Sequence, residues 1–236
     1  MAIDFSRRSR EDELMDTEPV PFEEFRDCLV DLARVNRLTF AYRPTVAFFD
    51  ELLPIARGLG RPMRIVDAGS GYGDMLRRIA DWARANEVDV ELAGVDLNPW
   101  SAKAAAESTA GDDIDWVTGD LFDYRPEGGI DVVVSSLFTH HLSDEAVVRF
   151  LSWMDETAQV GWFVNDLHRH RVPYHFFRHF AKLAGFHRFV QHDGPVSIAR
   201  AFTEADWRAF LRRAEVAGAQ VRWWMPFRIT VGKVSR

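Results

Sequence analysis

Two patterns of apolar residues alternate along the chain, which predicts that strands alternate with helices. Short apolar runs rich in β-branched residues are typical of buried parallel strands, whereas apolar residues that recur at every third or fourth position form one face of a helix. Runs of the first kind occupy residues 63–66, 90–95, 114–117, 131–135 and 162–164. Such alternation predicts right-handed crossovers and a parallel sheet.

Two amphipathic helices precede the first strand. Phe22, Phe25, Leu29 and Leu32 recur at helical spacing, and Arg43-Pro44 then opens a second helix. We expect residues 19–60 to form a helical cap that covers the sheet or closes over a ligand. Residues 1–18 are rich in Arg, Asp and Glu with few large apolar groups, which predicts a disordered tail.

A glycine-rich loop follows the first strand. The sequence from Val66 to Gly73 reads Val-Asp-Ala-Gly-Ser-Gly-Tyr-Gly, with a glycine at every second position from Gly69. Glycines accept positive φ and let a ligand approach the backbone, and the next helix aims free N–H groups at that ligand. The spacing differs from the dinucleotide fingerprint, and no Lys-Ser/Thr follows as in a P-loop. Asp67 suits an amine rather than a phosphate.

The next two strands also end at acidic residues. Asp96 lies 23 residues beyond Gly73, where a carboxylate would hold the hydroxyls of a ribose. Its alternative role is to cap the following helix, although Asn98 fills that position better. Asp120 can accept a hydrogen bond from an exocyclic amine, and Leu121 and Phe122 can sandwich a flat ring.

In order and spacing, residues 62–166 resemble the class I S-adenosylmethionine-dependent methyltransferases. The glycine loop is similar to the first motif of that family, Gly94-Val-Asp-Leu97 to the second, Gly119-Asp120 to the third, and the strand ending at Ser135-Ser136 to the fourth. The resemblance implies S-adenosyl-L-methionine as cofactor. It places Asp67 and Gly69 near the methionine part, Asp96 at the ribose and Asp120 at the adenine amine. The donor site it implies consists of Asp67, Ala68, Gly69, Gly71, Gly73, Asp96, Leu97, Asp120, Leu121, Phe122 and Ser136.

The fold that the resemblance implies is α/β and Rossmann-like. It has a seven-stranded, mostly parallel sheet with helices on both faces and an antiparallel last strand. Residues 221–225 and 227–234 would supply the closing pair, after a helix that begins with the capping box of Thr203 and Asp206. The methyltransferase domain is then residues 61–236.

Composition excludes several other classes of protein. The net charge of −7 argues against broad nucleic-acid binding, and the single Cys28 excludes an internal disulfide. No apolar run approaches the roughly 20 residues that span a bilayer, and the N-terminus lacks an apolar signal region. We expect a cytoplasmic protein whose oligomeric state the sequence leaves open.

An insertion at about residues 168–200 contains six of the eight histidines, interleaved with aromatic and basic residues. Three interpretations stay open: a lid over the acceptor site, an interfacial helix that makes peripheral contact with anionic lipid, or a packed accessory helix. His175 and His179 have the spacing of a helical metal pair, but no third ligand is evident. We therefore predict no metal.

The candidate catalytic residues are His140 and His141, which follow the fourth strand. Methyl transfer needs positioning above all, and a hydroxyl acceptor also needs a base for its proton, for which imidazole is suited. We expect His140 rather than His141 to face the pocket. The residues predicted to contact the acceptor are Arg37, Tyr42, His140, Phe176, Phe177 and His192.

The nearest branch by resemblance is the small-molecule one, which includes enzymes that methylate quinone and polyketide phenols. It implies O-methylation of a small aromatic or apolar hydroxyl acceptor. Two alternatives stay open: transfer to nitrogen or carbon, and a non-catalytic protein that binds S-adenosylmethionine as a scaffold.

Overall fold

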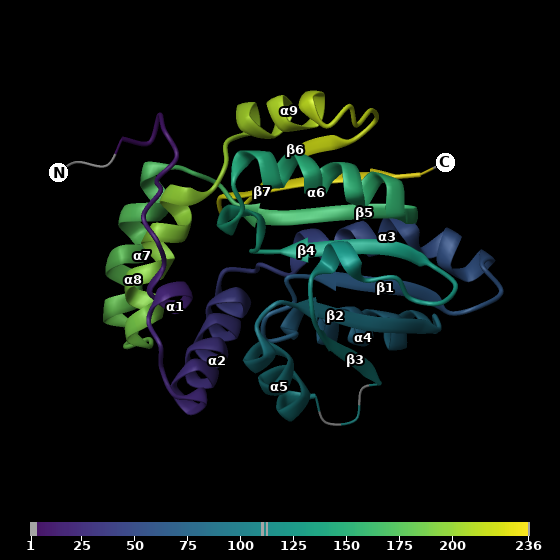
Figure 1. Ribbon diagram of the computed structural model, residues 1–236, viewed down its shortest axis with the longest axis horizontal. Coiled ribbons are helices and arrows are strands. Elements are labelled where there is room, and N and C mark those ends of the chain that lie inside the picture. The colour runs from purple at the N-terminus through teal and green to yellow at the C-terminus, as the bar shows by residue number, and fades with distance from the viewer. Residues whose placement is uncertain (1–3, 110, 112, 236) are drawn as a thin grey trace.

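The strands predicted from the sequence form one seven-stranded sheet in the computed structural model, which describes residues 4–235 except 110 and 112. The strand order is β3-β2-β1-β4-β5-β7-β6, and β7 alone runs antiparallel to the other six strands (Figure 1). The strands are β1 (Met63–Ala68), β2 (Val90–Asp96), β3 (Ile114–Thr118), β4 (Ile130–Ser136), β5 (Ala158–Leu167), β6 (Gln220–Trp224) and β7 (Arg228–Val234). The fold prediction is therefore confirmed.

Helices cover both faces of the sheet because the central strands are apolar on both sides. Val132 and Val134 of β4 join the core under α3 and α4, whereas Val133 joins the core under α6 and α9. The helices of the sheet layers are α3 (Arg43–Gly58), α4 (Asp74–Asn86), α5 (Pro99–Ser108), α6 (Asp144–Thr157) and α9 (Glu204–Arg213). The predicted capping box of Thr203 and Asp206 starts α9.

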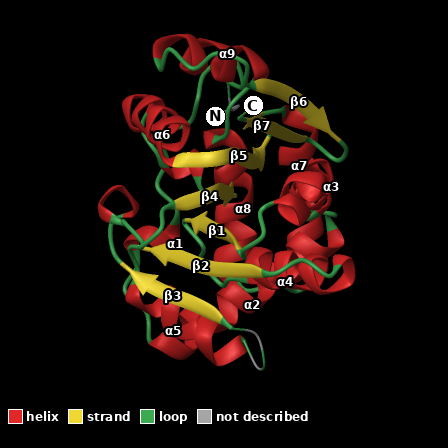
Figure 2. Cartoon of the chain, turned by 90° about the vertical axis from the view of Figure 1, so that its right-hand side faces the viewer, coloured by secondary structure: helices red, strands yellow, loops and turns green. Residues whose placement is uncertain are grey.

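A second group of helices lies at the carboxyl ends of the parallel strands, to the left in Figure 1. It consists of α1 (Leu14–Thr17), α2 (Phe22–Leu38), α7 (Arg171–Leu183) and α8 (Arg188–Arg200), and Figure 2 shows it from another side. The insertion thus contains two helices that pack on each other. Gly194 lies inside α8, where a Cβ would come within 2.0 Å of the Phe177 ring of α7. Within the part of the chain that the structure describes, every helix is too short or too polar to cross a membrane.

The N-terminal segment differs from the predicted disordered tail. Residues 4–18 run along α8 in Figure 1, and the Ser9 amide donates to Ala199 O at 3.0 Å. The amides of Leu14 and Met15 donate to the two oxygens of Asp193 at 2.8 and 3.0 Å. These partners lie almost the whole chain away, so local composition gives no sign of them. Residues 1–3 lie outside the described residues.

Candidate active site

A cavity of about 820 Å³ lies where the carboxyl ends of the parallel strands face the second group of helices. Its lining comes from the loops after β1, β2, β3 and β4 on one side and from α2, α7, α8 and the N-terminal segment on the other. Ligand sites of open α/β sheets form outside the carboxyl ends of the strands. This cavity is therefore the candidate active site.

The three positions of the loop require glycine for different structural reasons. All take positive φ, but a Cβ on Gly69 would come within 2.4 Å of the Phe138 ring, and one on Gly73 within 2.0 Å of Trp116. Gly69 and Gly73 thus let aromatic side chains pack on the loop. A Cβ on Gly71 would meet nothing within 4 Å, and this residue lines the cavity. Gly71 is where a ligand can approach the backbone most closely.

Asp67 is a buried carboxylate that forms no ion pair with any residue in the described part of the chain. Its side chain lines the cavity, and Oδ1 has no hydrogen-bond partner among the described residues. Burial raises the pKa of Asp67 well above its ordinary value, and the nearby charges of Asp74 and Asp96 add to this effect. A ligand that brings a primary ammonium group would satisfy the oxygen and favour its ionised form.

The two acids predicted to hold a nucleoside lie on the same rim. Asp96 accepts from Gly71 N through Oδ2 and from Asn98 N through Oδ1, both at 2.9 Å, and Asn98 caps α5 as predicted. Asp120 accepts from Phe122 N at 2.9 Å. Most of the predicted donor residues line the cavity; Ala68 and Gly73 lie outside its lining. The residues present fit the amino acid and the nucleoside of S-adenosylmethionine.

His140 is tied to a buried acid at the end of β5. Its Nδ1 lies 2.8 Å from Asp166 Oδ1, and its backbone amide donates to Asp166 Oδ2 at 3.0 Å. Asp166 also accepts from the Thr139 hydroxyl and from Leu167 N. Burial alone would raise its pKa, but the charge and hydrogen bond of His140 lower the pKa of Asp166 to about 2. An ionised Asp166 holds the proton on Nδ1 and leaves Nε2 as a proton acceptor.

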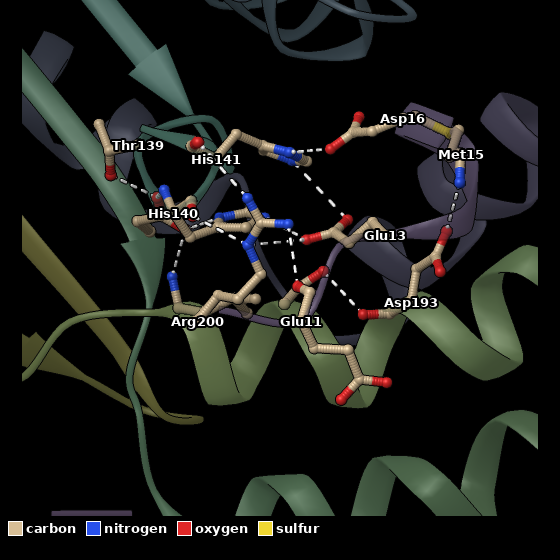
Figure 3. Close-up of polar contacts among 12 residues, drawn as sticks. Glu11, Glu13, Met15, Asp16, Thr139, His140, His141, Asp193 and Arg200 are labelled. Atoms are coloured by element: carbon tan, nitrogen blue, oxygen red, sulfur yellow. Dashed lines mark hydrogen bonds and ion pairs between the residues drawn. The ribbon is translucent and has the colours of Figure 1, made fainter. Parts of the chain in front are cut away.

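His141 faces the N-terminal segment rather than the sheet (Figure 3). Its Nδ1 lies 2.9 Å from Asp16 Oδ2, and burial, which would lower its pKa, is outweighed by Asp16 and Glu13, so the pKa of His141 is raised. The Nε2 atoms of His140 and His141 lie 3.7 and 3.8 Å from the carboxylate of Glu13. Both histidines line the cavity.

Glu13, His140 and His141 also form one group, among the described residues, whose possible metal-ligating atoms lie within 4.8 Å of one another. The guanidinium of Arg200, however, already lies 4.0 Å from Glu13 Oε1. Positive charge is thus present beside this carboxylate.

Four of the six residues predicted to contact the acceptor line the cavity, and two lie outside its lining. Tyr42, His140, Phe176 and Phe177 line the cavity, whereas Arg37 is exposed on α2 and His192 lies outside the lining, with Nδ1 2.8 Å from Asp193 Oδ1. The Tyr42 hydroxyl donates to Asp74 Oδ2 at 2.7 Å, which ties the cap to the start of α4.

Several residues of the site were not predicted from the sequence: Glu13, Asp16 and Arg228 of the lining, and Asp166, which lies outside the lining and contacts His140. Asp166 lies one residue before the end of β5, so the rule that strand ends carry ligand-binding residues could have found it. Glu13 and Asp16 reach the site only because the N-terminal segment folds back, and Arg228 because β7 runs antiparallel.

Part of the chain is similar in sequence to known methyltransferases. Residues 65–161 match a family described as a methyltransferase domain. The trans-aconitate 2-methyltransferase of Mycobacterium tuberculosis is 36% identical over 106 residues, which cover 44% of this chain and 37% of that protein. The enzyme of the same name from Mycobacterium marinum is 33% identical over 125 residues, covering 53% of this chain and 43% of that protein. The matched part is thus less than half the length of each relative.

Solved structures share the fold over most of the chain. The plantazolicin methyltransferase BpumL, in complex with a monoazolic desmethylPZN analog and SAH, has a TM-score of 0.62 at 11% identity and covers 90% of this chain and 96% of its own. Magnesium protoporphyrin IX methyltransferase from Synechocystis PCC 6803, with bound SAM, has a TM-score of 0.52 at 16% identity and covers 94% and 88%. At these identities the likeness to solved structures concerns the fold, and the methyltransferase-domain match covers residues 65–161.

Proposed function

We propose that this protein transfers the methyl group of S-adenosylmethionine to a hydroxyl oxygen of a small acceptor with an apolar body, and that His140 takes the proton of that hydroxyl. The observation that carries the proposal is that His140 lines the same cavity as the glycine loop and is paired with the buried Asp166 behind it. A donor site and a proton acceptor thus open on one chamber.

The donor supplies an electrophilic methyl group carried on a sulfonium. In this proposal Asp67 binds its ammonium group, Asp96 its ribose hydroxyls and Asp120 its adenine amine, while Gly71 leaves room along the loop. Enclosure by the cap would exclude water from the reacting atoms. Positioning is the main task of the chain, because the sulfonium already supplies the driving force.

The acceptor half of the chamber is lined mainly by apolar side chains from the second group of helices. They include Leu29, Leu32, Phe176, Phe177, Phe189 and Ile198. Such a surface suits a flat or extended apolar molecule, as in the branch that methylates quinone and polyketide phenols. It also supports the interpretation of the insertion as part of a lid.

A second candidate is transfer to a carboxylate oxygen. The sequence relatives are named trans-aconitate 2-methyltransferases, and the chamber lining contains the buried Arg228, a side chain suited to carboxylates. An ionised carboxylate has no proton to lose, so this reaction would not need His140 as a base.

The test is product analysis with donor that carries a deuterated methyl group. A panel of phenols, aliphatic alcohols, carboxylates, amines and activated carbon acids is incubated with the protein, and labelled products are identified by mass spectrometry and NMR. We expect label on oxygen of an apolar phenol. Label on nitrogen or carbon alone would contradict O-methylation. Binding heat with S-adenosylhomocysteine but no labelled product from any acceptor would favour a scaffold, and absence of that heat would contradict donor binding.

Donor binding should release a proton through Asp67. Below its raised pKa the free carboxyl is protonated, and an incoming ammonium favours the ionised form, so affinity should rise with pH until that pKa and then level off. Calorimetry with S-adenosylhomocysteine in buffers of different ionisation enthalpy measures the proton released. Asp67→Asn should abolish the release, whereas Asp120→Asn, at an exposed carboxylate, should keep it. Equal proton release from Asp67→Asn and the unaltered protein would contradict this role.

A further inference from the structure

Arg228 is a buried cation whose guanidinium is only partly satisfied. It is the first residue of β7, its exposed fraction is 4%, and it lines the cavity. Its Nη2 donates to Thr39 Oγ1 at 3.2 Å, whereas Nη1 has no hydrogen-bond partner among the described residues. An arginine has five N–H donors in a planar fork, so this side chain can still bind an anion through two of them.

No carboxylate of the described chain forms an ion pair with Arg228 within 4.0 Å. Asp166 is an acid that attracts it, but both Asp166 oxygens already accept two hydrogen bonds each, from Thr139, His140 and Leu167. Burial lowers the pKa of Arg228 to about 10, which shows how poorly this environment solvates its charge. A buried cation of this kind is costly unless a partner is brought from outside.

The position of Arg228 points to the acceptor rather than to the donor. Because β7 is antiparallel, its first residue lies at the carboxyl ends of the parallel strands and pairs with Leu167, the last residue of β5. In the sheet order, β7 is three strands from β1, which carries the glycine loop. At about 4.8 Å per strand, β7 lies about 14 Å from β1, on the side away from β2 and β3. The strands that carry the donor-binding loops are thus distant from Arg228.

A second polar atom without a partner lies close by. The backbone amide of His168 donates to Phe227 O at 3.1 Å, so His168 adjoins the start of β7. Its Nδ1 is buried, has no hydrogen-bond partner among the described residues, and belongs to a side chain that also lines the cavity. Two side chains, at the start of β7 and just after the end of β5, thus line the cavity with a buried polar atom that has no partner among the described residues, and the other walls are largely apolar.

We propose that Arg228 binds a carboxylate group of the acceptor, so that the acceptor class is an apolar or aromatic carboxylic acid. The proposal rests on the proposed function, because it concerns the acceptor half of the same chamber. The carboxylate would accept from the free side of the guanidinium, while the apolar body lies against α2, α7 and α8. Arg228 is then a specificity residue, which selects an anionic acceptor over a neutral one of equal shape.

The test compares a matched pair of probes, 2-naphthoate and 2-naphthamide, on the full chain saturated with S-adenosylhomocysteine. We expect calorimetry to show that the acid binds at least about 10-fold more tightly than the amide. Arg228→Met should remove this difference, and Arg228→Lys should keep part of it, since the charge remains but the fork is lost. The matched control is Arg222→Met on β6, an exposed arginine whose loss should leave the preference unchanged.

Several results would overturn the proposal. Equal affinity of the unaltered protein for acid and amide would do so without any variant, even if Arg228→Met fails to fold. So would a preference that survives in a folded Arg228→Met. A variant that loses about 10-fold or more in affinity for S-adenosylhomocysteine, but not for 5′-methylthioadenosine, would assign Arg228 to the carboxylate of the donor instead. If the unaltered protein did not bind S-adenosylhomocysteine, the proposed function itself would be contradicted. That outcome is distinct from a failure of the proposal for Arg228.

Discussion

Replacing Gly71 by alanine is expected to weaken binding of S-adenosylmethionine by about 10- to 100-fold, equivalent to about 1.4 to 2.8 kcal/mol. The reason is room: a Cβ at this position meets no protein atom within 4 Å and lies where the loop lines the cavity. The added methyl group would occupy space that the donor needs close to the backbone. Calorimetry with S-adenosylmethionine and S-adenosylhomocysteine measures the loss.

Backbone strain must be separated from this steric effect. Gly71 has φ +50°, where alanine costs about 1 to 2 kcal/mol, so the variant should also unfold at a lower temperature. Gly60→Ala is the matched control, because Gly60 has φ +67°, also meets nothing within 4 Å, and lies outside the cavity lining. It should show a similar drop in stability with unchanged donor affinity. Equal donor affinity in both variants would place the donor away from Gly71.

The donor half of the site could be predicted from the sequence because its parts are local. Asp67, Gly69 and Gly71 lie within five residues, Asp96 ends β2, and Asp120 follows the end of β3 by two residues. Parallel strands bring their carboxyl ends to one edge, so the pattern itself predicts that these residues meet. The same logic predicted the sheet, where alternation of strand and helix leaves few arrangements.

The acceptor half could not be predicted in the same way. Glu13 contacts His140 across 127 positions of the sequence, and Asp166 contacts it across 26. Nothing in the spacing of His140 and His141 indicates which carboxylate orients each ring. The pair that spacing did single out, His175 and His179, is exposed on α7 and lies outside the cavity lining. Helical spacing in the sequence identifies residues that are neighbours on one helix. This site instead brings together residues from several elements of the fold.

The glycines show a further limit of local patterns. The sequence predicted that Gly69 and Gly73 both serve a ligand, but a Cβ on either would meet the ring of Phe138 or Trp116, and only Gly69 lies on the cavity lining. A glycine that admits an aromatic ring and one that admits a ligand have the same sequence signature. Only the packing distinguishes the two.

Replacing His140 by alanine is expected to lower kcat for a phenol acceptor by about 100- to 10,000-fold, the usual contribution of a general base. Donor affinity should stay within about twofold, because the residues proposed to bind the donor lie on the loops after β1, β2 and β3. Steady-state kinetics, with calorimetry for the donor, measures both effects.

Two controls decide what the loss means. His175→Ala and His179→Ala, at exposed positions outside the cavity lining, should leave kcat unchanged. A carboxylate acceptor is the second control, since it has no proton to lose and should be methylated at a similar rate by the variant. A phenol rate that survives in His140→Ala would remove the base assignment. Equal losses for phenol and carboxylate acceptors would instead mean that His140, held by Asp166, shapes the chamber rather than accepting a proton.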